Sequence, residues 1–531
     1  MTFPELQLSK NEAKPATHSN TPQSNTAPGG GGGLRTDTLA DSLFIMLSLM
    51  VMQRLVGFFR AILFCRWLDP EQLGQWDMAF GFLMLAAPLA VLALPGTFGR
   101  YAERYRQRGQ LRGFIKRTAT LCAILAVVAV VVVWVARGWL SQQIFGTPEQ
   151  TELMAMLAVG LLVVIVYNYF ISLFTALRNI RLVSAMQMLN VLAFAGLGIV
   201  LLLGWRCTAA AAVVAYAGAA LVALLPVVWW STRVLANLRD ESLPTAQSSL
   251  WTTLIPFAGW ILIINLLTNL FEIVDRYMIV HYGSTLASES LAMVGNYHSS
   301  RVMPLLLTSV AAMLATVLTP HLSRDWEAGR RERVTAQLNL FIKVMAFGLT
   351  ALAVVVMFVA PLLFGVAFKD KFAEGLAVLP WSLTYCIWFS LAMVAQKYLW
   401  CAEKAGLVGA ALGIGLVVNI VLNLLLLPRM GLLGAVLATS AANLLALVLI
   451  LMFNWLLGFR LDRGTWALLA APLALCLGPW VSLLLLLAIA LEAFNTDRLL
   501  SPAEKRQLSD VCSSYLERFT ILQKVLRKTN G

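Results

Sequence analysis

The second half of this chain repeats the pattern of the first half. Residues 177–184 align with residues 402–409 at an offset of 225. Nearer the start of each half, LGQW at 73–76 aligns with VGNY at 294–297 at an offset of 221. Few of the aligned positions are identical, so the repeat is defined by its pattern and its register. The chain is therefore expected to fold into two related halves.

Both halves are built from long apolar segments. Hydrophobic residues make up 59% of the 531 residues and charged residues 13%, which is about half of the charge of a typical soluble domain. Segments of about 20 apolar residues recur along the chain, and a helix needs this length to cross a bilayer. The segments are continuously apolar, whereas the strands of a membrane β-barrel alternate. The sequence predicts an all-α polytopic membrane protein, and repeated apolar halves are typical of alternating-access carriers.

Twelve spans are predicted, in two pseudo-symmetric six-helix bundles. They cover residues 40–64, 78–99, 118–138, 151–174, 182–204, 208–230, 251–274, 291–319, 338–365, 376–400, 406–427 and 432–457. A further apolar stretch at 465–494 is interrupted by Gly478 and Pro479. It forms either one long tilted helix or a hairpin of two short helices, so the chain has 12 to 14 spans.

The spans and the polar segments between them divide the chain into six parts. These are a disordered cytoplasmic N-terminal tail (1–37), an N-terminal six-helix bundle (38–232), a cytoplasmic linker (233–250), a C-terminal six-helix bundle (251–458), additional transmembrane helices (465–494) and a cytoplasmic tail (495–531). The N-terminal tail is too polar to bury a core. The C-terminal tail opens with a capping box, SPAE at 501–504, and continues as an amphipathic helix that is expected to lie on the membrane or to dock on the bundle.

Lysine and arginine gather in alternate loops. One set of loops carries 19 of these residues and the other set carries 8. The positive-inside rule assigns the richer set, and with it both termini, to the cytoplasm of a bacterial inner membrane. An even number of spans satisfies this assignment, so 14 spans are favoured over 13. The loops also account for the net charge of +13, and no nucleic-acid partner is expected.

Neither the cysteines nor the short motifs indicate an enzyme. The seven cysteines are scattered without a CxxC pair, so no disulfide, metal site or cofactor is expected. The chain also lacks the DxD, HExxH, Walker and GxSxG patterns that carry chemistry in many enzymes.

Four motifs in order resemble one known family. They are RWLDPEQLG at 66–74, LR at 177–178, DRYMI at 275–279 followed by VGNY, and LLLLPRMGLLGA at 424–435. Together they resemble the polysaccharide transporter group of the MATE-like MOP flippase superfamily, over about residues 38–495. QRLVGFFR at 53–60 is also similar to the arginine-bearing first helix of peptidoglycan lipid II flippases. The acidic, aromatic-rich cation sites of the drug-exporting branch have no clear counterpart here.

The resemblance implies a flippase for lipid-linked oligosaccharides. Members of this group move undecaprenyl-diphosphate repeat units of surface polysaccharides from the cytoplasmic to the outer leaflet. The implied partners are the lipid-linked oligosaccharide, membrane lipids, and the polymerase and glycosyltransferase machinery.

Charged residues within spans are candidates for function because each costs about 2.5–3.5 kcal/mol on insertion scales. Arg54 and Arg60 are six residues apart, or about 120° out of alignment on a helix, so they border one site only if the cavity is wide. Guanidinium groups bind phosphate oxygens bidentately, and we expect both arginines to attract the diphosphate. The alternative for Arg60 is that it extends to lipid head groups at the end of the span.

The seventh span carries polar residues on one face. Asn265, Asn269 and Glu272 follow at helical spacing, which makes Asn269 a substrate-binding candidate and Glu272 a candidate for proton or Na⁺ coupling. A structural ion pair is the alternative for Glu272. Asp275 is a second coupling candidate, and it is expected near the outer surface, where it would hold a loop together with Arg276.

Four further basic residues are candidates for contact with the substrate. His298 and Arg301 share a helix face, and Pro304 is expected to kink that helix towards a cavity. For Arg301 the alternative is a salt bridge to Glu272 or Asp275, and for His298 it is an ordinary place in the core. Lys343 and Lys397 lie near predicted cytoplasmic ends, where they contact substrate or extend to head groups.

Three other functions stay open. A cation-coupled multidrug or small-molecule antiporter of the same superfamily would extrude dyes without a polyprenyl lipid. A membrane-embedded glycosyltransferase or polymerase needs an acidic pair or a large outer loop, whereas the longest outer loops here have about 16–17 residues. A non-transporting component of the synthesis machinery would tolerate neutralisation of every interior arginine.

Overall fold

The computed structural model describes residues 39–228, 247–510 and 513. The described part of the chain is helical and contains no strand. The predicted disorder of residues 1–37 and most of the predicted linker at 233–250 concern residues outside this part. Of the amphipathic helix expected from the capping box at 501–504 onwards, residues 502–510 are helical, and residues 514–531 lie outside the described part.

Within residues 39–228, the N-terminal half contains eight α-helices and one 3-10 helix. They are α1 (Leu39–Trp67), α2 (Pro70–Ala90), η1 (Leu94–Thr97), α3 (Phe98–Gln107), α4 (Leu111–Val135), α5 (Arg137–Phe145), α6 (Thr151–Ala176), α7 (Ile180–Gly204) and α8 (Ala209–Val222). Pro70 begins α2 at a position where its missing N–H has no cost, directly after the extended residue Asp69.

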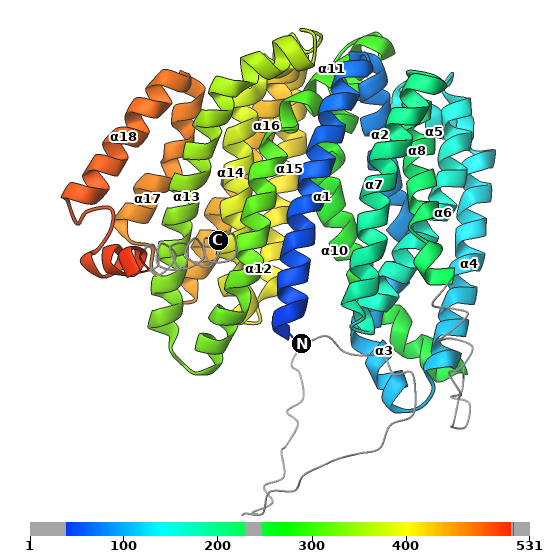
Figure 1. Cartoon of the computed structure of the whole chain (residues 1–531), viewed down its shortest axis with the longest axis horizontal. Helices are drawn as coiled ribbons and strands as arrows, with labels where there is room; N and C mark the ends of the chain where they lie inside the picture. Colours follow the sequence, from blue (N-terminus) through cyan, green and yellow to red (C-terminus); the bar gives the residue numbers. More distant parts are fainter. Residues whose placement is uncertain (1–38, 229–246, 511–512, 514–531) are drawn as a thin grey trace, which may run out of the picture. The chain divides into compact units, whose positions relative to one another are not determined.

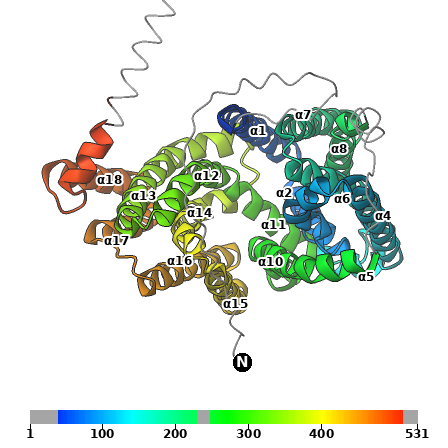
Figure 2. The same cartoon turned by 90° about the horizontal axis from the view of Figure 1, so that it is seen from below.

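The C-terminal half contains the longer helices and a short terminal pair. They are α10 (Gln247–Tyr282), α11 (Ala287–Arg301), α12 (Pro304–Glu327), α13 (Arg331–Leu362), η3 (Leu363–Ala367), α14 (Ala373–Cys401), α15 (Ala405–Met430), α16 (Leu432–Leu456), α17 (Arg463–Ala470), η4 (Ala471–Leu477) and α18 (Pro479–Asn495). In Figure 2, α10 and α11 lie between the N-terminal helices and the group from α12 to α16.

Eleven of the described helices are long and apolar enough to cross a membrane, or twelve if one bent pair is counted as a span. That pair, 70–90 and 94–107, is bent by 63° at η1. The prediction of a span at 78–99 is therefore wrong in its bounds, because the helix begins at Pro70. The stretch at 465–494 forms two shorter apolar helices, as the hairpin alternative expected. The count of 14 spans stays a prediction.

Pro304 divides the predicted span at 291–319 into two helices. α11 ends at Arg301 and α12 begins at Pro304. A proline inside a helix has no N–H to donate and its ring collides with the preceding turn. The predicted kink is confirmed, and it places Arg301 at the end of α11.

The two halves pack closely through α2 and α11. A Cβ atom on Gly74 would overlap the carbonyl oxygen of Leu291, and one on Gly295 would overlap that of Pro70. Only glycine permits two helix backbones to approach this closely. The same end of the molecule, where α1 meets α2 in Figure 1, also holds an ion pair in which Lys371 Nζ lies 2.8 Å from Asp69 Oδ1.

Candidate functional site

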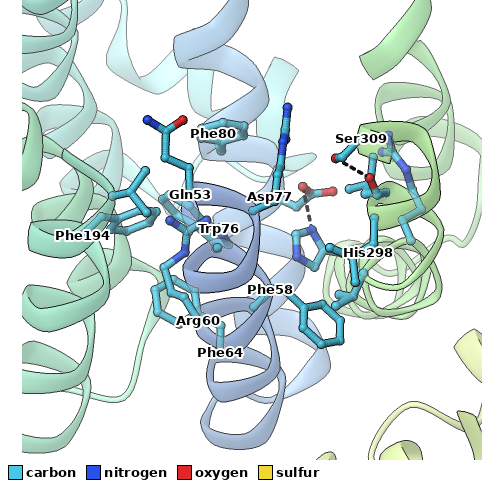
Figure 3. Close-up of a pocket in the computed structure, with 18 of the residues that line it drawn as sticks. Gln53, Phe58, Arg60, Phe64, Trp76, Asp77, Phe80, Phe194, His298 and Ser309 are labelled. Atoms are coloured by element: carbon cyan, nitrogen blue, oxygen red, sulfur yellow. Dashed lines mark hydrogen bonds and ion pairs between the residues drawn. The ribbon is translucent and has the colours of Figure 1, made fainter. Parts of the chain in front are cut away.

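A cavity of about 470 Å³ lies between helices of both halves. Its walls come from α1, α2 and α7 in the N-terminal half and from α10, α11 and α12 in the C-terminal half. Figure 3 shows its labelled side chains turned towards a common space. A site with walls from both halves changes shape whenever the halves move against each other, and alternating access requires this property.

Aromatic rings form the N-terminal wall of the cavity. Phe64, Trp76 and Phe194 contact one another with ring centroids 5.5–6.0 Å apart, and Phe80 packs against Trp76 at 5.6 Å. Tilted and edge-on pairs at these distances are favourable. The wall is therefore rigid and mostly apolar, with few groups that compete for a charged ligand.

Arg54 and Arg60 line the same cavity although they are out of alignment on α1. The Arg60 guanidinium carbon lies 4.0 Å from the centroid of the Phe194 ring, which is close enough for a cation–π interaction. Arg54 is exposed, whereas Arg60 is partly buried. Helix α1 continues to Trp67, so Arg60 is not at its end and turns towards the cavity instead of head groups.

Asp77 lines the cavity and connects the two halves of the chain. It is 2% exposed, and its Oδ1 lies 2.8 Å from His298 Nδ1. Arg276 Nε lies 3.0 Å from Asp77 Oδ2. The geometry of this second contact is not that of a hydrogen bond, because neither atom has a hydrogen-bond partner in the described part of the chain. Asp77 therefore holds Arg276 by charge and His298 by a hydrogen bond.

Arg301 lies where this cavity meets a second one. The second cavity, of about 100 Å³, is lined by Glu272, Asp275 and Tyr297, and Arg301 lines both. The Arg301 guanidinium carbon lies 5.3 Å from the centroid of the Tyr297 ring. No ion pair to Glu272 or Asp275 is present among the described residues, and Arg301 Nε has no hydrogen-bond partner there. Arg301 is partly buried, and a buried donor without a partner, such as its Nε, is costly, so this group is available to an anionic ligand.

The larger cavity carries an excess of positive charge. Four arginines line it, and the one carboxylate among its lining residues is Asp77. Charge of one sign in a cavity with low-dielectric walls attracts ions of the opposite sign. The arrangement suits an anion with several oxygens and repels organic cations.

Asp275 occupies a different environment from the one expected. It is 2% exposed and accepts hydrogen bonds from four side chains. The donors are Tyr297 Oη at 3.1 Å, Asn419 Nδ2 at 2.9 Å, Asn423 Nδ2 at 3.0 Å and Thr439 Oγ1 at 2.7 Å. The expectation that Asp275 holds a loop near the outer surface is wrong, because α10 continues to Tyr282 and α15 and α16 cover this carboxylate.

The other carboxylate and amide candidates of α10 are placed differently. Glu272 is exposed to the smaller cavity. Asn269 is partly buried and lines neither of the two cavities. Glu272 and Asp275 therefore share the smaller cavity, and Asn269 lies apart from it.

The two lysine candidates lie away from both cavities. Lys343 is 2% exposed, and its Nζ contacts Glu504 Oε2 at 2.9 Å and also pairs with Asp462. Its role as a substrate contact is therefore corrected: Lys343 on α13 holds the helix at residues 502–510 (the C-terminal helix), which contains Glu504. Lys397 Nζ lies 4.1 Å from the centroid of the Trp400 ring.

Sequence reasoning missed Asp77 and the cavity position of Arg276. Asp77 was placed outside the predicted span at 78–99, although Asp69, Pro70 and Glu71 form a helix-start signal that puts Asp77 two turns inside α2. Arg276 was assigned to the outer surface with Asp275. The burial of Arg276 depends on α2 and α11 packing against α10, which no local pattern shows.

Comparisons with known proteins agree with this architecture. The family described as "Polysaccharide biosynthesis protein" matches residues 39–326. No curated protein sequence matches the chain.

Three solved structures share the fold. A lipid II flippase, MurJ, in an inward closed conformation is 13% identical, with a TM-score of 0.64 over 90% of this chain and 100% of that one. An inward-facing multidrug resistance MATE transporter of the MOP superfamily is 15% identical, with a TM-score of 0.58 over 80% and 98%. A MOP superfamily transporter from Pyrococcus furiosus, described by the reverse polarity of its binding pocket, is 15% identical, with a TM-score of 0.55 over 79% and 94%.

The matched segment covers more than half of the chain and includes α1, α2, α10, α11 and α12, which carry the cavity. The resemblance predicted from the motifs is thereby confirmed. This multi-pass membrane protein belongs to the polysaccharide biosynthesis protein family and has the fold of MOP-superfamily transporters.

Proposed function

We propose that the protein flips a polyprenyl-diphosphate-linked oligosaccharide across the bacterial cytoplasmic membrane by alternating access. One observation carries the proposal: four arginines and a single carboxylate line a cavity between the two halves. A diphosphate offers several anionic oxygens, and guanidinium groups bind such oxygens in pairs.

The position of each arginine supports a path for the diphosphate. Arg54 is exposed and precedes Arg60 on α1, the helix whose first residue the loop charges assign to the cytoplasmic side. Arg60 and Arg301 line the same cavity and are less exposed, and Arg301 Nε has no hydrogen-bond partner in the described part of the chain. An incoming diphosphate first meets a solvated charge and then groups that are less exposed, where charge-assisted hydrogen bonds are stronger.

The charge of the cavity argues against export of cationic drugs. A cavity with excess guanidinium repels an organic cation, and its one carboxylate is already paired with Arg276 and His298. Export of a small anion needs no polyprenyl chain and differs from flipping in that respect.

We also propose Asp275 as the carboxylate that couples transport to an ion gradient. Its neighbours Asn419, Asn423 and Thr439 all carry oxygen atoms, and Asn423 Oδ1 has no hydrogen-bond partner in the described part of the chain. Carboxylate, amide and hydroxyl oxygens are ligands of hard cations. Rotation of the two amides would present these oxygens to a monovalent cation beside the smaller cavity.

The test compares surface polysaccharide in a deletion strain that carries the parent chain, Arg54→Ala or Arg301→Ala at matched membrane levels. Arg331→Ala is the control, because Arg331 also stacks on a ring, that of Trp326 at 4.5 Å, but lies outside the cavity. We expect both cavity variants to leave the lipid-linked intermediate in the cytoplasmic leaflet. Normal polysaccharide and normal leaflet distribution in both would contradict the proposal.

A further inference from the structure

Asp77 is the one acid among the residues that line the main cavity. Its two partners come from the other half of the chain: Arg276 from α10 and His298 from α11. Asp77 itself belongs to α2. The contact therefore joins the N-terminal and C-terminal halves directly, and in Figure 3 the dashed line from Asp77 to His298 crosses between them.

This contact lies one helical turn from the place where the backbones of α2 and α11 touch. We call this end of the molecule the closed end. Gly74, one turn before Asp77 on α2, touches the backbone of α11 at Leu291. Gly295, one turn before His298 on α11, touches the backbone of α2 at Pro70. Parting of α2 and α11 at this end would therefore separate Asp77 from His298 as well.

We propose that Asp77 is a charge-operated latch, which keeps the two halves together at this end until a diphosphate in the cavity competes with it for Arg276 and the neighbouring guanidinium groups. The inference rests on the proposed function, since it takes the diphosphate group as the competing anion.

The charges of the residues that line the cavity support a latch. With no ligand present, Asp77 is the anion that compensates Arg276, and its 2% exposure leaves little hydration to replace this partner. Pulling α2 away would leave a buried carboxylate and a buried guanidinium unpaired, which is strongly unfavourable. The ion pair therefore stabilises the closed end.

A bound diphosphate reverses this balance. Its oxygens satisfy Arg276 and Arg301 and bring negative charge beside Asp77. Like charges at short distance in a poorly solvated site repel each other. The carboxylate then gains by separating from the ligand, and the closed end is released. A ligand shifts a conformational equilibrium only through different affinities for the two states, and competition for Arg276 provides that difference.

The experiment measures access to the cavity from the outer side. Ser309 lines the cavity, and its hydroxyl donates a hydrogen bond only to the Leu305 carbonyl of its own helix among the described residues. The substitution Ser309→Cys therefore disturbs few contacts and places a reactive thiol in the cavity. It is introduced into a chain whose seven cysteines are replaced, and labelling by a membrane-impermeant thiol reagent is followed from outside, with and without farnesyl diphosphate.

We expect farnesyl diphosphate to accelerate labelling of this reporter chain by about 5-fold or more, the lower range of an allosteric coupling. Asp77→Asn should label at the accelerated rate without ligand and should respond little to its addition. Asp77→Glu keeps the charge and should restore the dependence on ligand. Asp325→Asn is the matched control: Asp325 is a buried acid paired with Arg330, at 2.6 Å, but within one half.

Two results separate the latch from the proposed function. If farnesyl diphosphate accelerates the reporter chain while Asp77→Asn labels as slowly as that chain without ligand, the latch is wrong and the diphosphate site stands. If farnesyl diphosphate binds the reporter chain but does not change its labelling, the latch is wrong; if it neither binds nor changes the labelling, the proposed recognition of a diphosphate is wrong as well. Asp77→Asn protein that elutes like the parent in size-exclusion chromatography excludes misfolding as the cause.

Discussion

Gly74 and Gly295 hold equivalent places in the two halves and contact each other's helix. A Cβ built on Gly74 would lie 3.1 Å from the backbone nitrogen of Gly295 and would overlap the carbonyl oxygen of Leu291. The sequence repeat therefore forms the joint between the halves at the end where α1 meets α2. At this joint, helix backbone packs directly against helix backbone.

Alanine at either glycine should keep this end from closing. We predict that Gly74→Ala and Gly295→Ala fold but lose most of their transport activity, because the added methyl group meets helix backbone that cannot move aside. The measurement is labelling of the Ser309→Cys reporter from the outer side, which should be fast without ligand. Gly348→Ala is the control, since no atom lies within 4 Å of its Cβ position. Slow labelling in both variants would show that the joint tolerates a side chain.

The ring of Phe194 should contribute to binding of the diphosphate by fixing Arg60. Phe194→Leu removes the ring below the guanidinium but retains an apolar side chain. Cation–π contacts contribute about 0.5–2 kcal/mol, so we predict that the apparent affinity for farnesyl diphosphate falls about 2- to 30-fold. Phe194→Tyr keeps a ring and should bind like the parent. Equal affinities for the parent chain and Phe194→Leu would exclude this role.

Coupling should depend on Asp275 more than on Glu272. Asp275 accepts four hydrogen bonds in a buried site, whereas Glu272 is exposed. We predict that Asp275→Asn abolishes the response of transport to an imposed Na⁺ or proton gradient and leaves farnesyl diphosphate binding within about 2-fold of the parent, since no direct contact is lost. Glu272→Gln should keep most of the response. The opposite pattern would move the coupling site to Glu272.

Docking of the C-terminal helix should weaken in acid. Burial raises the pKa of Asp462, but hydrogen bonds from Lys343 and Thr465 lower it more, and the net pKa lies below its ordinary value. A carboxyl with a depressed folded-state pKa stabilises the fold above its unfolded pKa, about 3.9 for Asp, and loses this contribution as pH falls through the folded value.

We therefore predict that Asp462→Asn lowers Tm at pH 7, and that the difference from the parent begins to shrink near pH ~4 and disappears only below the folded-state pKa of Asp462. Lys343→Met should lower Tm further and should expose the segment between Asn495 and Ser501 to protease, because Glu504 also loses its partner. A Tm difference for Asp462→Asn that stays constant as the pH is lowered from 7 to well below ~4 would show that its ionisation does not matter.

The sequence predicted features that depend on local chemistry. The apolar segments predicted the membrane helices, Pro304 predicted the break between α11 and α12, and the alignment of LGQW with VGNY identified the segments that form the joint. Arg54 and Arg60 were expected to border a wide cavity, and the structure places both in one.

Partners from distant parts of the chain could not be predicted. Lys343 meets Glu504 across 161 residues, and its burial depends on how the C-terminal helix docks. Asp275 is satisfied by side chains from α15 and α16, and its place near the end of α10 suggested a surface position. Asp77 was missed because the first residues of α2 are polar, so the predicted span began only at residue 78, after Asp77.

The most direct test of the account is transport of the proposed substrate by purified protein. The measurement follows a fluorescent polyprenyl-diphosphate sugar in proteoliposomes, with a quencher outside, and compares the parent chain with Arg301→Ala and Arg331→Ala. We predict that the parent and Arg331→Ala flip the lipid at similar rates and that Arg301→Ala is about 10- to 100-fold slower, as expected for the loss of a charge-assisted hydrogen bond. Equal rates for all three proteins, or no flipping by the parent, would contradict a diphosphate path through this cavity.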